Sequence, residues 1–326
     1  NRIDTVGRVK SMKKISILIP CYNEEENVRE ISAALIKQFQ ECLSEYDYEI
    51  VFIDNASTDK TRVYLREMCR ENKKVKAIFN IRNFGQNNSP FYGLLQTTGD
   101  CSITMSCDFQ DPVEMIPKFI KEWENGHTLV MAVKSSSKEN KVKYFLRTTY
   151  YKLFRKMSTI EPIEHFTGFG LYDRSFVNIL RDLNDPIPFM RGIIAEFGYN
   201  YSIIEFEQPP RKAGKTHNNI MTLYSIAMRS FTNYTRMGIR TMSVLSCVGA
   251  GICLIIAIVY FILKLCNWNA YQTGTIPILL IILTLGFFQL FFIGLLGEYM
   301  YNLNVRLLNR PLVVEAERLN FESDEE

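Results

Sequence analysis

Three short polar segments carry the residue types that could do chemistry in this chain. They are Pro20 to Glu24 (PCYNE), Asp54 to Asp59 (DNASTD) and Ser106 to Asp111 (SCDFQD). Each follows an apolar run, where a carboxylate such as Asp54 or Asp108 gains nothing from burial unless something binds it. Carboxylate and amide oxygens at these positions suit a base, a ribose and a divalent metal, and Asp108 and Gln110 are the candidate metal ligands.

The elements that must position these segments alternate along the first part of the chain. Strands are expected at 15–20, 49–54, 75–79, 101–107 and 129–133, and helices at 28–39, 61–69, 91–97 and after Pro112. This alternation predicts an α/β fold with a mostly parallel sheet and helices on both faces. Ligands in such folds bind at the carboxyl ends of the strands, so we expect the three polar segments to lie together.

Composition excludes some function classes and leaves a structural alternative open. The 38 basic and 35 acidic side chains give a net charge of +3, which does not indicate nucleic acid as a partner. Neither G-x-G-x-x-G after the first strand nor G-x-x-x-x-G-K-[ST] occurs, so no dinucleotide or phosphate-loop motif is present. Asp111, followed by Pro112 and Glu114, fits a helix cap as well as a chemical role.

Seven segments, in the same order as in a known family, resemble glycosyltransferase family two. The resemblance is to its branch that loads sugars onto polyprenyl phosphates, which includes dolichyl-phosphate mannose synthase and bacterial undecaprenyl-phosphate glycosyltransferases. The segments are IPCYNEEENV at 19–28, IDNASTDKT at 53–61, NIRNFGQNNSPFYGLLQTTGD at 80–100, CDFQDPVE at 107–114, FMRG at 189–192, RKAGKT at 211–216 and GLLGEYMYNLNVRLLNRPLVV at 294–314.

The resemblance implies a GT-A (Rossmann-like) domain that transfers a sugar, with inversion, from a nucleotide sugar to a polyprenyl phosphate. It favours a UDP-sugar over a GDP-sugar and implies Mg²⁺ or Mn²⁺ on Asp108 and Gln110. The implied donor-nucleotide residues are Pro20, Tyr22, Asn23, Glu24, Asp54, Arg82 and Asp108. The implied catalytic residues are Asp108, Gln110 and Asp111, with Arg211 and Lys215 as a clamp on the diphosphate, while Lys134 and Arg147 are candidates for the acceptor phosphate.

Departures from the family pattern keep two other functions open. Ser106 stands where the family usually has a carboxylate, Asn55 and Ala56 replace Asp-Gly, and Thr167-Gly168-Phe169 replaces Gly-Asp-Phe. The first alternative is therefore a membrane-anchored nucleotide-sugar-binding protein with reduced or lost catalysis. The second is a relative of processive polysaccharide synthases, although their Gln-x-x-Arg-Trp element is absent, since Glu122 and Asn267 precede the two tryptophans.

A long uncharged stretch predicts attachment to a lipid bilayer. Between Thr241 and Leu303 the only charged residues are Lys264 and Glu298, and basic residues flank the stretch on both sides. We therefore expect a multi-pass protein of the inner membrane with a cytosolic catalytic domain, and the sequence leaves a homo-oligomer open. The expected parts are a flexible arm (1–14), the catalytic domain (15–216), an amphipathic juxtamembrane helix (217–240), transmembrane helices (241–264 and 276–302), a short extracytoplasmic loop (265–275) and a cytosolic tail (303–326).

Overall fold

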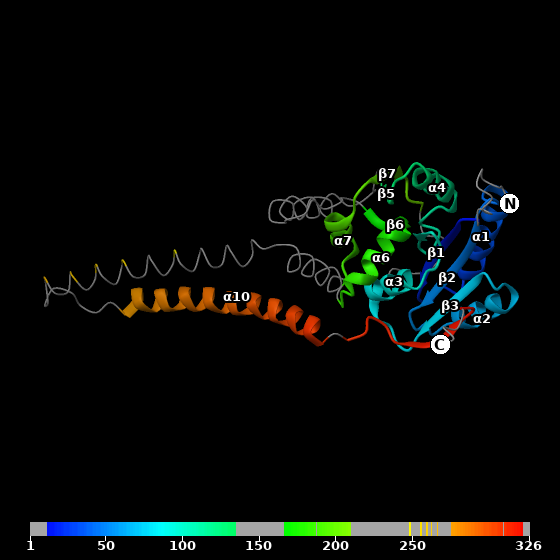
Figure 1. The fold of residues 1–326 in the computed structure, drawn as a ribbon. Coiled ribbons are helices and arrows are strands. Elements are labelled where there is room, and N and C mark those ends of the chain that lie inside the picture. Colours follow the sequence, from blue (N-terminus) through cyan, green and yellow to red (C-terminus); the bar gives the residue numbers. More distant parts are fainter. Residues whose placement is uncertain are drawn as a thin grey trace.

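The structure of the protein is a computed structural model (Figure 1). It describes residues 12–134, 166–186, 188–209, 275–308 and 310–321, together with the single positions Val248, Ile255, Val259, Ile262 and Cys266. The expected juxtamembrane helix 217–240 lies outside the described residues, as do Arg147, Arg211 and Lys215.

An eight-stranded sheet forms the centre of the described part, with strand order β7-β5-β6-β4-β1-β2-β3-β8. Strands β4, β1, β2 and β3 run parallel to one another, whereas β6 is antiparallel to both β4 and β5, and β8 is antiparallel to β3. The strands are β1 (Lys14–Cys21), β2 (Asp47–Asp54), β3 (Val75–Asn80), β4 (Cys101–Thr104), β5 (Leu129–Lys134), β6 (Phe166–Asp173), β7 (Tyr201–Phe206) and β8 (Glu315–Leu319). The predicted α/β class with a mostly parallel sheet is confirmed.

Helices cover both faces of the sheet (Figure 1). One face packs against α1 (Val28–Cys42), α2 (Thr61–Glu71) and α4 (Ile116–Glu124), which follows the short 3₁₀ turn Val113–Met115. The other face packs against α3 (Gly85–Leu95), α6 (Arg174–Leu183) and α7 (Met190–Phe197).

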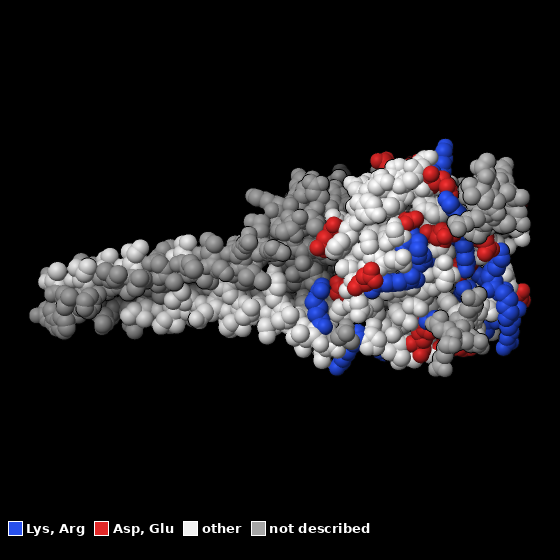
Figure 2. Space-filling view, in the orientation of Figure 1, with Lys and Arg blue, Asp and Glu red and all other residues white. Residues whose placement is uncertain are grey.

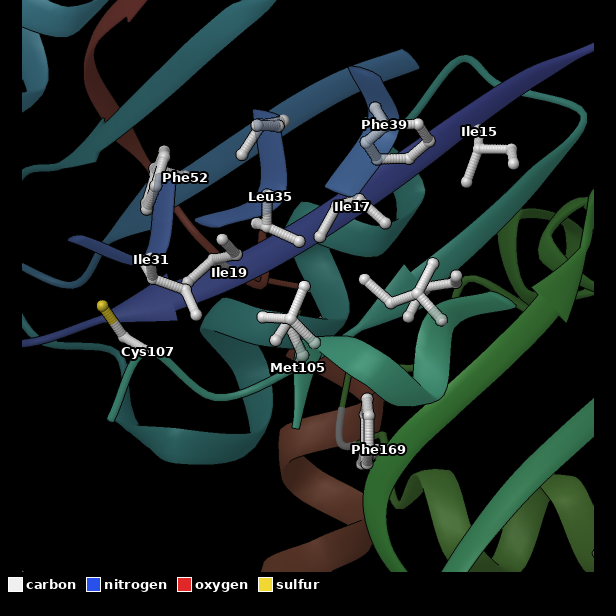
Figure 3. Close-up of a cluster of buried hydrophobic side chains, with 14 of the residues drawn as sticks. Ile15, Ile17, Ile19, Ile31, Leu35, Phe39, Phe52, Met105, Cys107 and Phe169 are labelled. Atoms are coloured by element: carbon white, nitrogen blue, oxygen red, sulfur yellow. The ribbon is translucent and has the colours of Figure 1, made fainter. Parts of the chain in front are cut away.

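Both faces of strand β1 are buried, which explains why its sequence is apolar without alternation. Ile15, Ile17 and Ile19 point into the cluster that contains α1 (Figure 3), and Leu18 points into the cluster on the opposite face. On that opposite face Gly93 lets α3 approach closely, because a Cβ there would lie 2.7 Å from the Leu18 side chain. All four β1 side chains are fully buried, which is the burial that a central parallel strand requires.

A buried carboxylate joins the amino ends of β1, β2 and β3. Glu49 receives salt bridges from Lys76 at 2.8 Å and Lys14 at 2.9 Å, and hydrogen bonds from the Ser16 hydroxyl at 2.6 Å and the Thr98 N–H at 2.7 Å. Burial alone would raise the pKa of Glu49, but these donors lower the pKa to about 2. Glu49 therefore stays ionised and paired at the amino ends of the strands, whereas the polar segments lie at the carboxyl ends.

The C-terminal region returns to the sheet. Helix α10 (Thr275–Leu308) extends away from the sheet domain in Figure 1, and β8 then pairs with the outer strand β3. Figure 2 shows α10 almost free of charged residues, which gather instead on the sheet domain. The expected tail 303–326 therefore contains a strand that its sequence did not predict.

The structure contradicts the expectation of a multi-pass membrane protein. Among the described residues, no helix is both long enough and apolar enough to cross a bilayer. The expected span 241–264 lies outside the described residues apart from single positions, and α10 covers the second span, 276–302.

Candidate functional site

The carboxyl ends of β1, β2 and β4 meet at one edge of the sheet and bring the three polar segments together. Cys21 pairs with Asp54 across β1 and β2, and Leu18 pairs with Thr104 across β1 and β4. The pairing continues one residue beyond the strands, since the Asn55 N–H donates to the Cys21 carbonyl at 2.9 Å. The segments therefore leave the sheet side by side, as the topology rule predicted.

The segment after β1 is fastened to the segment after β2. The Asn23 N–H donates to the Ser57 hydroxyl at 2.9 Å, and Asn23 Oδ1 accepts from the Thr58 N–H at 2.8 Å. The Glu24 N–H donates to the Thr61 hydroxyl at 2.9 Å. Asn23 has a φ of +55°, a left-handed conformation that asparagine tolerates better than most residues. Asn23 and Glu24 thus serve the structure of the edge in addition to any role in binding.

Asp54 has partners within the chain that the sequence analysis missed. Its fully buried carboxylate accepts from Arg62 Nε at 2.6 Å and from the Ser57 N–H at 3.2 Å. Arg62 also donates to the Asn80 carbonyl at 2.6 Å, so one arginine joins the ends of β2 and β3. Burial of Asp54 therefore does not by itself require a ligand. Only the position of Arg62 in the first turn of α2, eight residues after Asp54, could have signalled this pair.

Asn55 shapes the segment that carries Arg82. Its side-chain Nδ2 donates to Asn83 Oδ1 at 2.9 Å and to the Gly85 carbonyl at 3.3 Å, and its Oδ1 accepts from the Phe84 N–H at 2.8 Å. The exposed Arg82 guanidinium lies over the Phe84 ring, 4.2 Å from its centroid. An aspartate at position 55 could accept from Phe84 but could not donate to the Gly85 carbonyl, which gives the departure at Asn55 a structural consequence.

The third polar segment is a compact turn and not the extended strand end that we expected. Strand β4 ends at Thr104, and Phe109 has a φ of +59°, so strand alternation does not set the directions of Asp108 and Gln110. Asp108 Oδ1 accepts from the Gln110 N–H at 3.2 Å, which closes the turn locally. Asp108 is almost completely buried.

The donor set in this turn fits a divalent cation that takes most of its ligands from a substrate. Asp108 and Gln110 offer one carboxylate and one amide oxygen, which are hard ligands of the kind Mg²⁺ and Mn²⁺ accept. Within the described ranges, no three His, Cys, Asp or Glu side chains gather into a metal cluster. Such a site would resemble the magnesium sites that use one or two carboxylates together with phosphate oxygens.

Asp111 lies in the same turn and is buried. Its Oδ2 accepts from the Ser106 N–H at 2.7 Å. Burial raises the pKa of Asp111 above its ordinary value and the charge of Asp108 adds to this, while the Ser106 N–H and the charge of Lys134 act in the opposite direction. Lys134, a candidate for the acceptor phosphate, ends β5 and is partly exposed.

A cavity of about 500 Å³, here called the α3–β6 cavity, opens beside this turn. Pro20 lies in its wall, while α3 contributes one side and β6 another. The buried hydroxyl oxygens of Thr104 and Ser106 have no hydrogen-bond partner among the described residues. The lining residues are Pro20, Gln86, Asn87, Pro90, Phe91, Leu94, Thr104, Met105, Ser106, Asp111, Phe166, Gly168, Phe169, Tyr172, Pro188, Phe189, Met190 and Arg191.

The cysteines of this edge do not supply a nucleophile. Cys21 and Cys107 are buried, and burial raises the pKa of both thiols well above the ordinary value. The charges of Asp54 and Glu24 raise the pKa of Cys21 further, and those of Glu24 and Asp108 do the same for Cys107. Both side chains therefore remain neutral thiols near pH 7, which are poor nucleophiles.

Comparison with known proteins identifies the family. The family model described as Glycosyl transferase family 2 matches residues 16–183. A relative described as the SfII prophage-derived bactoprenol glucosyl transferase of Shigella flexneri is 32% identical over 299 residues, which cover 91% of this chain and 96% of the relative. The putative glycosyltransferase CsbB of Bacillus subtilis is 30% identical over 308 residues, 93% of this chain and 92% of that protein.

Among solved structures, glucosyl-3-phosphoglycerate synthase from Mycobacterium tuberculosis in complex with Mn²⁺, UDP and phosphoglyceric acid gives a TM-score of 0.45. Its sequence identity is 14%, over 68% of this chain and 78% of that chain. The family match and the mostly parallel sheet together fit the expected GT-A architecture. The resemblance seen in the motifs is confirmed, and the chain is a glycosyltransferase that belongs to glycosyl transferase family 2.

Proposed function

We propose that the chain transfers a glycosyl group from a UDP-sugar to a polyprenyl phosphate, with inversion at the anomeric carbon. The observation that carries the proposal is that three buried carboxylates, Asp54, Asp108 and Asp111, follow neighbouring strands at one edge of the sheet, with Asp111 in the wall of the α3–β6 cavity. The name of the Shigella flexneri relative, which matches over nearly its whole length, supports a bactoprenol acceptor. The proposed catalytic unit comprises residues 15–216 together with β8.

The acceptor itself supplies the nucleophile in this proposal. A phosphate monoester with a second pKa of about 6 is largely a dianion at pH 7 and needs no strong general base. Its oxygen forms a bond to the anomeric carbon as the bond from that carbon to the β-phosphate oxygen breaks, and the nucleoside diphosphate leaves with the electron pair. Charge on the leaving diphosphate is therefore what the protein must stabilise.

The candidate residues divide among the cation, the leaving diphosphate, the acceptor phosphate and the nucleotide. Asp108 and Gln110 would hold Mg²⁺ or Mn²⁺, which when bound neutralises negative charge on the diphosphate. Arg211 and Lys215 are proposed to close over the same diphosphate, and Lys134 and Arg147 to bind the acceptor phosphate. Asp111 lies in the cavity wall next to Asp108 and completes the proposed catalytic set. For the nucleotide we propose Pro20, Tyr22, Asn23, Glu24, Asp54 and Arg82.

The direct test is a transfer assay with the purified full chain. A panel of UDP-sugars and GDP-sugars is incubated with undecaprenyl phosphate and Mg²⁺ or Mn²⁺, and products are identified by mass. We expect a glycosyl undecaprenyl phosphate from a UDP-sugar, and its anomeric configuration, read by NMR, should be opposite to that of the donor. Binding of UDP-sugars without product from any donor would favour the non-catalytic alternative and overturn the proposal.

Asp54→Ala is expected to weaken UDP binding about tenfold or more. The proposed role of Asp54 is to accept a hydrogen bond from the base, and leaving that ring N–H unpaired costs about 1 to 3 kcal/mol. Isothermal titration calorimetry with UDP measures the dissociation constant. The control is Asp59→Ala, which removes a carboxylate of the same segment that accepts from the Thr61 N–H at 3.0 Å. Unchanged UDP affinity in a folded Asp54→Ala variant would remove Asp54 from the nucleotide site.

A further inference from the structure

Strand β8 presents different residues to the two faces of the sheet because its pairing is irregular. Glu317 pairs with Phe79 and Glu315 pairs with Asn80, so Ala316 is an extra residue opposite the bond between Phe79 and Asn80. A bulge of this kind turns the following side chain to the other face. Glu315 thereby faces the side of the sheet that carries α3, while Glu317 faces α2.

Two side chains of β8 hold α3. Glu315 Oε1 accepts from the Tyr92 hydroxyl at 2.9 Å, and Arg318 donates to Gln96 Oε1, also at 2.9 Å. Arg318 and Glu315 are joined by a salt bridge of 2.7 Å, so the four side chains form one connected group. Burial, together with the hydrogen bond to Glu315, raises the pKa of Tyr92 to about 12, so its hydroxyl stays protonated as the donor.

The residues around β8 support the same region. The Ile81 N–H donates to the Val314 carbonyl at 3.1 Å, immediately before the candidate nucleotide residue Arg82. Leu312 and Phe321 pack against the core cluster that contains Phe91 of α3. The C-terminal segment therefore contacts both α3 and the segment that leads into it.

The opposite side of α3 forms a wall of the α3–β6 cavity, through Gln86, Asn87, Pro90, Phe91 and Leu94. We infer that β8 is a positioning element of this cavity, with Glu315 as the residue that sets the position of α3 for binding the glycosyl part of the donor. The kinetic consequence of the inference rests on the proposed function. Asp111 in the cavity wall lies next to the proposed cation ligand Asp108, so the cavity adjoins the diphosphate and would hold the glycosyl group attached to it. The structural part of the inference, that Glu315 supports α3, does not depend on any substrate.

The chain offers a matched control on the same strand. Glu317 accepts from Arg66 of α2 at 2.6 Å, and each of these two side chains is 37% exposed. Glu317→Ala thus removes the same kind of side chain and the same kind of ion pair as Glu315→Ala, but on the face away from the cavity. A loss of stability alone should appear in both variants, whereas a positioning effect should appear only in Glu315→Ala.

The kinetic experiment compares these variants with UDP-glucose as donor and undecaprenyl phosphate as acceptor. We expect Glu315→Ala to raise the KM for UDP-glucose about tenfold, with kcat changed by no more than about threefold, since the lost hydrogen bond supports the helix that forms the cavity wall and does not touch the reacting atoms. The affinity for UDP, which has no glycosyl group, should stay within about twofold. Glu315→Gln, which can still accept from Tyr92, should recover part of the KM, and Tyr92→Phe should add little in the Glu315→Ala background.

Hydrogen exchange tests the structural half independently. Amide exchange in α3 should be about tenfold faster in Glu315→Ala than in Glu317→Ala at the same temperature. Absence of transfer by the wild type would be a failure of the proposed function, and the exchange measurement would still decide whether Glu315 positions α3. Equal exchange rates in α3 for both variants would overturn the inference, as would equal KM values in an active enzyme.

Discussion

Asp108→Asn is expected to lower the rate of glycosyl transfer by about three orders of magnitude while the fold stays intact. In the proposed mechanism Asp108 is the one carboxylate ligand of the cation, and loss of several kcal/mol of charge stabilisation on the diphosphate corresponds to about that factor. The turn should survive, because an asparagine oxygen can still accept from the Gln110 N–H as Asp108 Oδ1 does. Single-turnover kinetics at saturating donor, with circular dichroism as the check on folding, measure the effect.

Ser106→Asp is the companion variant for this experiment. It introduces a second carboxylate into the turn, and we expect transfer to persist with half-maximal rate at a lower metal concentration. Near-normal turnover of Asp108→Asn in the presence of Mg²⁺ or Mn²⁺ would mean that Asp108 does not hold the cation. A Ser106→Asp variant with an unchanged metal requirement would argue that position 106 does not reach the cation either.

Glu49→Leu is expected to lower the free energy of unfolding by about 3 to 5 kcal/mol. The substitution leaves two ammonium groups, on Lys14 and Lys76, and the Thr98 N–H without the carboxylate that they now share, and removal of one partner of a buried ion pair typically costs this much. Urea unfolding followed by circular dichroism measures the loss. Glu41→Leu, at an exposed helical position 3.9 Å from Lys37, serves as the control and should change stability by less than about 0.5 kcal/mol.

The same residue should dominate the acid sensitivity of the protein. The pKa of Glu49 falls from an ordinary 4.5 to about 2 in the folded chain, which corresponds to about 3 kcal/mol. Because the pKa is lowered by folding, this stabilisation is complete above about pH 4.5 and is lost as the pH falls toward 2. Wild type should therefore lose more stability between pH 5 and about pH 3 than Glu49→Leu does, and parallel pH profiles of the two proteins would contradict the assignment.

The strands that sequence patterns predicted are those buried on both faces. The apolar runs of β1, β2, β3 and β5 lie within one or two residues of the expected ranges, because a central strand needs apolar residues at every position. No element was expected at β6, α6, α7 or β7. Strand β8 was missed for a physical reason: its bulge breaks the alternation of side chains, and its charged residues form ion pairs above and below the edge of the sheet.

The candidate site was predicted where it depends on topology and missed where it depends on packing. The meeting of Asp54 and Asp108 at one edge follows from parallel strands alone. The pairing of Asp54 with Arg62 and the contacts of Asn55 with the turn before α3 depend on side-chain positions that no spacing rule gives. Helix α3 was expected at 91–97 and lies at Gly85–Leu95, with Pro90 inside it, so the wall of the cavity was not foreseen either.

The pairing of β3 with β8 also bears on how the protein is made. Strand β3 ends at Asn80 and its outer neighbour begins at Glu315, so most of the chain must leave the ribosome before β3 gains that neighbour. At about 5 to 20 residues per second, the outer side of β3 stays unpaired for on the order of ten seconds or more during translation. Nascent chains, and products truncated before Glu315, therefore expose a strand able to pair with other chains, and we expect these species to be the ones that chaperones must hold.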